Sequence, residues 1–174
     1  RTDVTFVELH KPPGQTARIL PRLWSTLRRL EPDIFHTRNV ATLEGQAAAW
    51  LARVPHRVHG EHGWDMGDLD GSNLTMLRLR RLMRHFVHHQ IALSMPTQRY
   101  LIDKVGVAPA RVTNICNGVD TDVFVPATDL GHARATLDGF GLTADAFVVG
   151  AVGRLAAVKN LPMLITTEAQ RRNL

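Results

Sequence analysis

Cysteine, aromatic residues and long apolar runs are scarce in this sequence, and each shortage excludes a class of protein. One residue of the 174 is cysteine, so a disulfide framework is excluded. Because Cys116 lies in the apolar-looking run VTNICNG, we expect a buried, inert thiol in a reducing cytoplasm. Aromatic residues make up 6% of the chain, too few for the stacking platforms of nucleic-acid-binding proteins. No apolar run approaches the roughly 20 residues that span a bilayer, and the N-terminus lacks the layout of a signal peptide.

Positive charge, by contrast, is in excess. The 21 Lys and Arg residues outnumber the 16 Asp and Glu residues and give a net charge of +5. This balance favours anionic partners, and by itself it leaves phosphates, nucleic acid and acidic membrane surfaces open. With 44% hydrophobic and 21% charged residues, the composition is that of a soluble globular protein.

Strand-like and helix-like segments alternate along most of the chain. We expect strands at 4–9, 33–37, 54–60, 90–94, 111–116 and 147–152, and helices at 19–30, 42–53, 74–89, 97–105 and from Asn160 onward. Strands separated by helices indicate right-handed crossovers and a parallel sheet, so the fold class is α/β, of the doubly wound kind. The pattern weakens after the NGVD of residues 117–120, and we place a domain boundary near residue 121.

The segment VVGAVGRLAAVKNL, at 148–161, has the layout of a phosphate-binding turn. A buried strand leads into Gly153, a short loop carries Arg154 and Lys159, and a helix opens at Asn160. A helix N-terminus beyond the carboxyl end of a strand offers free N–H groups to an anion, and the two cations can hold a diphosphate. The alternative is that Gly153 ends a strand and the two cations are only solvated.

Three segments occur in a telling order: GEHG at 60–63, NGVDTDVFVP at 117–126 and VGAVGRLAAVKN at 149–160. In this order and spacing the chain resembles family 4 of the retaining glycosyltransferases. HTRN at 36–39 and DLDGSN at 68–73 make the likeness closer to the exopolysaccharide-associated sugar transferases of bacteria. The resemblance implies the GT-B fold, with two Rossmann-like domains. Residues 1–120 would be a nearly complete N-terminal, acceptor-side domain, and residues 121–174 a linker and the start of the nucleotide-sugar-binding domain.

The resemblance also implies site residues. Arg154 and Lys159 look like the cationic pair that holds the donor diphosphate and stabilises the departing nucleotide, with Gly153 and Asn160 beside them in the donor site. His62 looks like the family's cleft histidine, near the sugar. The alternative for His62 is a structural histidine that bonds a backbone carbonyl in a turn.

The NGVD element resembles the family's exit from the first domain. Asn117, Gly118 and Asp120 would form a hinge, in which glycine permits a positive φ and the polar side chains cap the turn. A catalytic carboxylate at Asp120 is the alternative. Two parts of the family pattern are missing: a glycine-rich loop that would precede Arg1, and an acidic E-x7-E pair that would follow Leu174. We therefore expect an internal section of a longer protein, inactive by itself, and whether it binds donor alone stays open.

The predicted helix that ends at His89 carries a basic stripe. Its members are Arg78, Arg81, Arg84, His85 and His88, spaced three and four residues apart. Such a stripe could rest on anionic lipid headgroups, and a plain solvated face is equally compatible with it. His85, His88 and His89 have a spacing that could hold a metal, but structural histidines are favoured because no further ligand is nearby. We predict no metal and no cofactor.

Two classes of function remain in view. The first is an enzyme, a retaining glycosyltransferase of the hexosyltransferase type in polysaccharide biosynthesis. It would move a sugar from a nucleoside diphosphate sugar to a saccharide or lipid-linked saccharide, in the cytoplasm or at the inner face of the plasma membrane. The second is a non-catalytic module that binds phosphate or nucleic acid, although no nucleic-acid partner is predicted; a sugar-nucleotide epimerase would need carboxylates that are not visible. The sequence leaves the sugar, the nucleotide base, the acceptor and the oligomeric state open.

Overall fold

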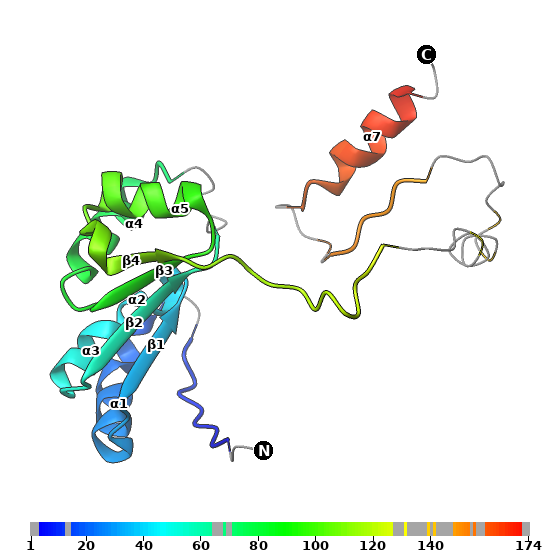
Figure 1. Ribbon diagram of the computed structural model, residues 1–174. Helices are drawn as coiled ribbons and strands as arrows, with labels where there is room; N and C mark the ends of the chain where they lie inside the picture. The colour runs from blue at the N-terminus through cyan, green and yellow to red at the C-terminus, as the bar shows by residue number, and fades with distance from the viewer. Residues whose placement is uncertain are drawn as a thin grey trace. The chain divides into compact units, whose positions relative to one another are not determined.

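The structure is a computed structural model that describes residues 4–12, 15–63, 68, 71–126, 131, 139, 141, 148–153, 155 and 159–171. The chain divides into two compact units, Arg1–Gly118 and Val119–Leu174 (Figure 1). The acceptor-side and donor-side roles that the sequence suggests for two domains, and their boundary at 120/121, stay predictions.

A four-stranded parallel sheet forms the centre of the first unit (Figure 1). Its strands are β1 (Ile34–Arg38), β2 (His56–Glu61), β3 (His89–Ala92) and β4 (Val112–Asn114), in the spatial order β1-β2-β3-β4. The pairs Arg38↔Gly60 and Glu61↔Ala92 lie near the carboxyl ends of their strands. Because all four strands are parallel, their carboxyl ends lie at the same edge of the sheet. This arrangement confirms the α/β class with a parallel sheet.

Helices connect successive strands and form one layer. Because the strands follow one another in chain order, right-handed crossovers place their helices on the same face of the sheet. Contacts of α1 with α3, of α2 with α4 and of α4 with η1 agree with a single layer. The elements are α1 (Thr16–Leu30), α2 (Val40–Leu43), α3 (Gly45–Leu51), α4 (Leu74–Met83), α5 (Met95–Tyr100), the π-helix η1 (Leu101–Val105) and the 3-10 helix η2 (Pro109–Arg111).

Local sequence explains where these helices begin and end. Helix α1 ends because Glu31 takes a left-handed conformation and Pro32 cannot continue the helix. Helix α4 begins at Asn73, whose side chain accepts hydrogen bonds from the N–H groups of Thr75 and Met76. Ser94 caps α5 in the same way.

Alternation along the strands separates the two faces of the sheet. Towards the helices the strands bury Thr37, His59, Glu61, Gln90, Ala92 and Val112. On the opposite face Ile34, His36 and Thr113 are exposed. Several of the buried strand residues are polar, which is unusual for a central parallel strand and directs attention to what they bind.

Several predicted elements differ from the structure. Residues 4–9 and 148–152 form no strand, because a β-strand needs a hydrogen-bonded neighbour and none pairs with them in the described part of the chain. The predicted helix at 42–53 is divided into α2 and α3, and the one at 97–105 continues from α5 into η1. The predicted helix at 74–89 ends at Met83, because His89 is already paired with Val58 in the sheet.

One helix of the second unit is described. Helix α7 (Leu161–Arg171) begins directly after Asn160, which confirms the helix predicted to open there. Asn160 itself has a positive φ of 45°, and its carbonyl accepts a hydrogen bond from Met163 N–H.

Candidate functional site

The candidate site of the first unit lies at the carboxyl ends of β1 and β2, where the HTRN and GEHG segments come together. In open α/β sheets this edge is where ligands bind. Asn39 follows β1 and His62 follows β2, and the two residues are joined directly by a hydrogen bond.

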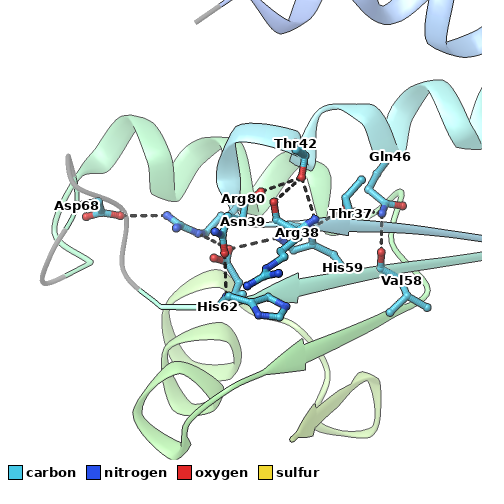
Figure 2. A network of polar contacts seen from close by, with 11 residues as sticks. Thr37, Arg38, Asn39, Thr42, Gln46, Val58, His59, His62, Asp68 and Arg80 are labelled. Carbon is cyan, nitrogen blue, oxygen red and sulfur yellow. Dashed lines mark hydrogen bonds and ion pairs between the residues drawn. The ribbon is translucent and has the colours of Figure 1, made fainter. Parts of the chain in front are cut away.

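Asn39 connects the two strand ends. Its N–H donates to Gly60 O at 2.8 Å. Its side-chain Oδ1 accepts from His62 N–H at 3.0 Å (Figure 2). The backbone of Asn39 has φ 61° and ψ 162°, a region that is almost restricted to glycine. A non-glycine residue persists in such a conformation only where its surroundings hold it, and here the two cross-strand bonds do so.

A chain of buried charges lies beside this connection. Arg80 Nε donates to Glu61 Oε1 at 2.8 Å, and Arg80 Nη1 donates to Asp68 Oδ2 at 3.0 Å (Figure 2). Each of the three residues is 3% exposed. Asp68 Oδ1 also accepts from Asn73 N–H, the cap of α4. The guanidinium therefore ties the end of β2 to the start of α4.

The protonation of Glu61 follows from these contacts. Burial alone would raise the pKa of the carboxyl, but His59 and Arg80 outweigh it and leave the pKa of Glu61 below its ordinary value. Glu61 is therefore a carboxylate at neutral pH, and its charge is balanced by Arg80 within the helix-covered side of the sheet.

A second polar chain continues from His59 toward β1. Nδ1 of His59 lies 2.8 Å from Oγ1 of Thr37, and Gln46 donates from Nε2 to Thr37 Oγ1 and to Val58 O. Nε2 of His59 lies 3.6 Å from Oε1 of Glu61. These contacts make the ends of β1 and β2 one connected polar network (Figure 2).

His62, the predicted cleft histidine, is half-buried at the end of β2. Its Nδ1 is buried and has no hydrogen-bond partner among the residues that the structure describes. Burial lowers the pKa of His62, and the nearby Arg38, His36 and His59 lower it further, while Glu61 opposes them. The ring is therefore neutral at pH 7 and able to accept or donate a hydrogen bond.

The second unit brings three of its predicted site residues together. Gly153, Lys159 and Asn160 line a groove of about 410 Å³ at the N-terminus of α7, together with apolar residues. A Cβ on Gly153 would lie 3.6 Å from Cε of Lys159, so the lysine side chain lies across the glycine. Arg154 lies outside the described residues.

The NGVD element is exposed, and the structure assigns its parts differently from the expectation. Oδ1 of Asp120 accepts hydrogen bonds from the N–H groups of Asp122 and Val123, so the predicted side-chain cap is confirmed for this residue. Gly118 does not have a positive φ, so the expected use of glycine freedom is wrong there. Asn117 is exposed, and the hinge role of the element stays a prediction.

Cys116 is exposed, so the expectation of a buried thiol is wrong. The residue lies two positions beyond the end of β4, where the chain leaves the sheet and its core. The apolar neighbours in the sequence misled the prediction, because Ile115 beside it is itself 53% exposed.

The basic stripe is largely occupied with backbone contacts. Arg81 donates to Lys104 O, and Arg84 donates to the carbonyls of Val105 and Gly106, at the C-terminal end of η1. His88 contacts Arg57, whereas His89 contacts Thr113, so the closely spaced histidines face different partners. No cluster of three metal-binding side chains occurs among the described residues, and no helix in that part of the chain is long and apolar enough to cross a membrane.

Sequence reasoning missed Arg80, Asp68 and Asn39. A signal for Arg80 was available, since Met76, Arg80, Met83 and Val87 recur at helical spacing and the arginine takes a position on the apolar face. Asn39 and Asp68 lie in the HTRN and DLDGSN segments, but nothing local in those segments indicated the bonds to His62 and Arg80, which are distant in the sequence.

Comparisons with known proteins agree with this fold. The sequence profile described as Glycosyltransferase Family 4 matches residues 1–123. The chain belongs to this family. It is 30% identical over 141 residues to the Escherichia coli UDP-Gal:alpha-D-GlcNAc-diphosphoundecaprenol alpha-1,3-galactosyltransferase, covering 79% of this chain and 36% of that enzyme. It is 32% identical over 172 residues to the D-inositol 3-phosphate glycosyltransferase of Streptosporangium roseum, covering 91% of this chain and 38% of that enzyme.

A solved structure supports the fold of this family 4 member. Anabaena HepE in complex with UDP-glucose superimposes with a TM-score of 0.67 at 28% identity, covering 92% of this chain and 42% of HepE. The chain is thus a glycosyltransferase-family chain with a GT-B-type fold, and it spans well under half the length of these relatives.

Proposed function

We propose that the chain is part of a retaining glycosyltransferase of the hexosyltransferase type, which transfers a sugar from a nucleoside diphosphate sugar to a saccharide or lipid-linked saccharide in polysaccharide biosynthesis. The observation that carries the donor half is the groove at the start of α7, where Gly153, Lys159 and Asn160 meet. The positive end of the helix dipole lies there, Lys159 adds a positive charge, and both favour a diphosphate.

The relatives support the choice of substrates. HepE was crystallised with UDP-glucose, and the E. coli relative is named for a UDP-sugar donor and a lipid diphosphate acceptor. A nucleoside diphosphate sugar therefore suits the donor groove. The second relative is named for D-inositol 3-phosphate.

The proposed chemistry is mainly electrostatic. Lys159 and Arg154 stabilise the negative charge that develops on the departing nucleotide diphosphate. The leaving phosphate assists the acceptor hydroxyl on the same face of the sugar, so no side chain needs to act as the base. We assign the sugar to His62, which is neutral and half-buried at the end of β2, as the residue of the first unit that it approaches.

We place the reaction in the cytoplasm, with peripheral contact at the inner face of the plasma membrane where lipid-linked acceptors lie. Arg78 is exposed on α4 and is available for lipid headgroups, whereas Arg81 and Arg84 are already engaged with backbone carbonyls. The membrane contact therefore involves few charges of this helix and is weak.

The test uses the longest natural protein that contains this chain. It is incubated with UDP- and GDP-sugars and with lipid-linked saccharide acceptors, and nucleotide release and the anomeric configuration of the product are measured. The double variant Arg154→Ala and Lys159→Ala is expected to lose about 100-fold or more in kcat, the usual effect of removing groups that stabilise transition-state charge. Unchanged turnover in that variant, or no nucleotide release with any donor, would falsify the proposal.

A further inference from the structure

Three basic side chains gather on the open face of the sheet at the carboxyl ends of β1 and β2. Strand alternation directs His36 and Arg38 away from the helices, since Thr37 between them is buried on the helix side. His62 follows β2 on the same side as Gly60, whereas Glu61 is turned toward Arg80. The carboxylate and the three basic groups are thus on opposite faces.

Because residue 60 is a glycine, the imidazole rings of His36 and His62 can both lie against its backbone. A Cβ at Gly60 would lie 2.7 Å from Nε2 of His62 and 3.2 Å from Nε2 of His36, so any side chain there would displace the rings. The glycine does not have a positive φ, so its small size rather than its backbone freedom explains it.

Within the described residues the cluster has no carboxylate of its own. Glu61, next to His62 in the chain, forms its ion pair with Arg80 and is 3% exposed. Arg38 is exposed and forms no ion pair in the described part of the chain. An uncompensated arginine beside two histidines is a local excess of positive charge that favours a bound anion.

The backbone that carries Arg38 is held in place. Thr42 Oγ1 accepts from Arg38 N–H at 2.9 Å and donates to Arg38 O at 2.6 Å (Figure 2). Asn39, the next residue, is bonded to both Gly60 and His62. The guanidinium therefore extends from a fixed anchor point, which reduces the entropy lost when it binds a ligand.

We propose that Arg38 and His36 bind a phosphate group of the acceptor, which is therefore a phosphate-bearing saccharide or lipid-linked saccharide. The inference rests on the proposed function and adds an acceptor subsite to it. Arginine suits phosphate because its planar donors bind two oxygens at once, and a neighbouring histidine supplies a further N–H. His62 does not bond the anion directly, since the Nδ1 of its ring is buried and the Nε2 is turned toward Gly60. The negative charge of the anion instead shifts the pKa of the His62 ring.

The pKa of His62 distinguishes anion binding by Arg38 from a purely structural role of Arg38, because only a bound anion changes that pKa. Burial lowers the pKa of His62, and Arg38 and His36 lower it further, with His59 on β2 acting in the same direction and Glu61 against them. An anion between Arg38 and His36 offsets their charge, so the pKa of His62 rises when phosphate binds. By the same linkage, affinity for phosphate weakens as pH rises through that pKa.

The experiment titrates the 174-residue chain with inorganic pyrophosphate and glucose 1-phosphate, measuring affinity by calorimetry and the His62 ring pKa by NMR. Arg38→Gln is expected to weaken binding about tenfold or more, the size of one lost charge-assisted interaction. Arg38→Lys should fall between, because it keeps the charge but loses the paired donors. Arg22→Gln, an exposed residue of α1 with the same charge change, should bind as the unaltered chain does. Melting temperatures establish that all the variants are folded.

Further arms identify the source of the phosphate. Tighter binding to vesicles that contain a polyprenyl diphosphate than to glucose 1-phosphate assigns a lipid-linked acceptor, and the reverse assigns a soluble one. The inference is overturned if Arg38→Gln and Arg22→Gln behave alike, if the pKa of His62 is unmoved by saturating pyrophosphate, or if Arg38→Gln weakens UDP binding alone. Transfer by the longer protein with an unchanged acceptor KM in Arg38→Gln overturns the subsite and leaves the proposed function standing.

Discussion

Asn39 shows how a single strained residue can organise a site. Its conformation is one that L-amino acids rarely adopt, and strain of this kind costs about 1–3 kcal/mol. In return, the backbone and side chain of Asn39 join the ends of β1 and β2 at the point where His62 emerges. The strained backbone of Asn39 thus lies at the point that fixes the position of the His62 ring.

The first prediction separates the side chain of Asn39 from its backbone. Asn39→Ala removes the acceptor for His62 N–H and should lower the free energy of unfolding by about 1 kcal/mol, because one hydrogen bond is lost. Asn39→Asp keeps an acceptor oxygen in the same place and should stay within about 0.5 kcal/mol of the unaltered chain. Urea denaturation measures both, and equal stability of the Ala and Asp variants would contradict the assigned role.

Arg80 is the second residue on which the site depends. Its removal leaves the carboxylates of Glu61 and Asp68 buried without their counter-charge, so Arg80→Leu should destabilise the first unit by about 3–5 kcal/mol. The matched control is Arg78→Leu, two positions earlier and exposed, which should change stability by no more than about 0.5 kcal/mol. A comparable loss in the two variants, measured by guanidinium denaturation, would show that the buried triad contributes little.

At the scale of elements, the junction between α4 and η1 is held by an arginine that passes over a glycine. Gly106 has a φ of 79°, and a Cβ there would lie 2.2 Å from Nη1 of Arg84, which donates to Val105 O. The end of the π-helix therefore requires glycine for two reasons, its left-handed backbone and the close approach of a side chain.

A glycine pair tests this junction. Gly106→Ala should destabilise the first unit by about 1–2 kcal/mol, the cost of a left-handed alanine, and it also displaces Arg84. The added Cβ of Gly118→Ala would have no atom within 4 Å, and Gly118 does not have a positive φ. The stability of this variant should therefore be unchanged or slightly raised. Thermal melts compare the two, and a harmless Gly106→Ala would mean that the backbone rearranges freely there.

Helical periodicity predicted most elements of the first unit, and tertiary contacts decided the rest. The position of α1 follows from Ile19, Leu23 and Leu27, whose spacing is visible in the sequence and which are buried. The end of α4 does not, because His89 belongs to β3 through pairing with a strand some thirty residues earlier. Val4 and Phe6 look like strand residues and are exposed, since no neighbouring strand pairs with them in the described sheet.

The candidate-site residues that lie within sequence motifs could be predicted, whereas those that depend on side-chain contacts between distant segments could not. His62, Gly153, Lys159 and Asn160 were named from their segments, and the last three do line one groove. Arg80 binds partners 19 and 12 residues away, and such pairing leaves no local pattern beyond a charged residue on an apolar face.

For the whole molecule, one contribution to acid stability comes from His88, which is remote from the site. Nε2 of His88 lies 2.7 Å from Nη2 of Arg57, which can only donate, so the ring must be neutral. Burial lowers the pKa of His88, and the charges of Arg57, Arg111 and His56 lower it further, against a hydrogen bond to Pro55.

The sign of the pH dependence follows. The unfolded chain binds a proton at His88 near pH 6.5 and the folded chain only at lower pH, so this stability is fully present above 6.5 and is lost as pH falls toward the folded pKa. Glu61, with its lowered pKa, adds a second loss in more acid solution. We expect His88→Gln to lose less stability between pH 7.5 and 5.5 than the unaltered chain, as measured by urea midpoints. His85→Gln, exposed in the turn after α4, is the control and should keep the original slope.

The exposed thiol of Cys116 also gives the molecule an experimental handle. It is the one cysteine of the sequence, and it lies just after β4 and two residues before the first unit ends at Gly118. A maleimide fluorophore would therefore attach at a single defined position beside the junction of the two units. The unaltered chain can thus carry a spectroscopic reporter at the segment that joins the two units, without any engineered cysteine.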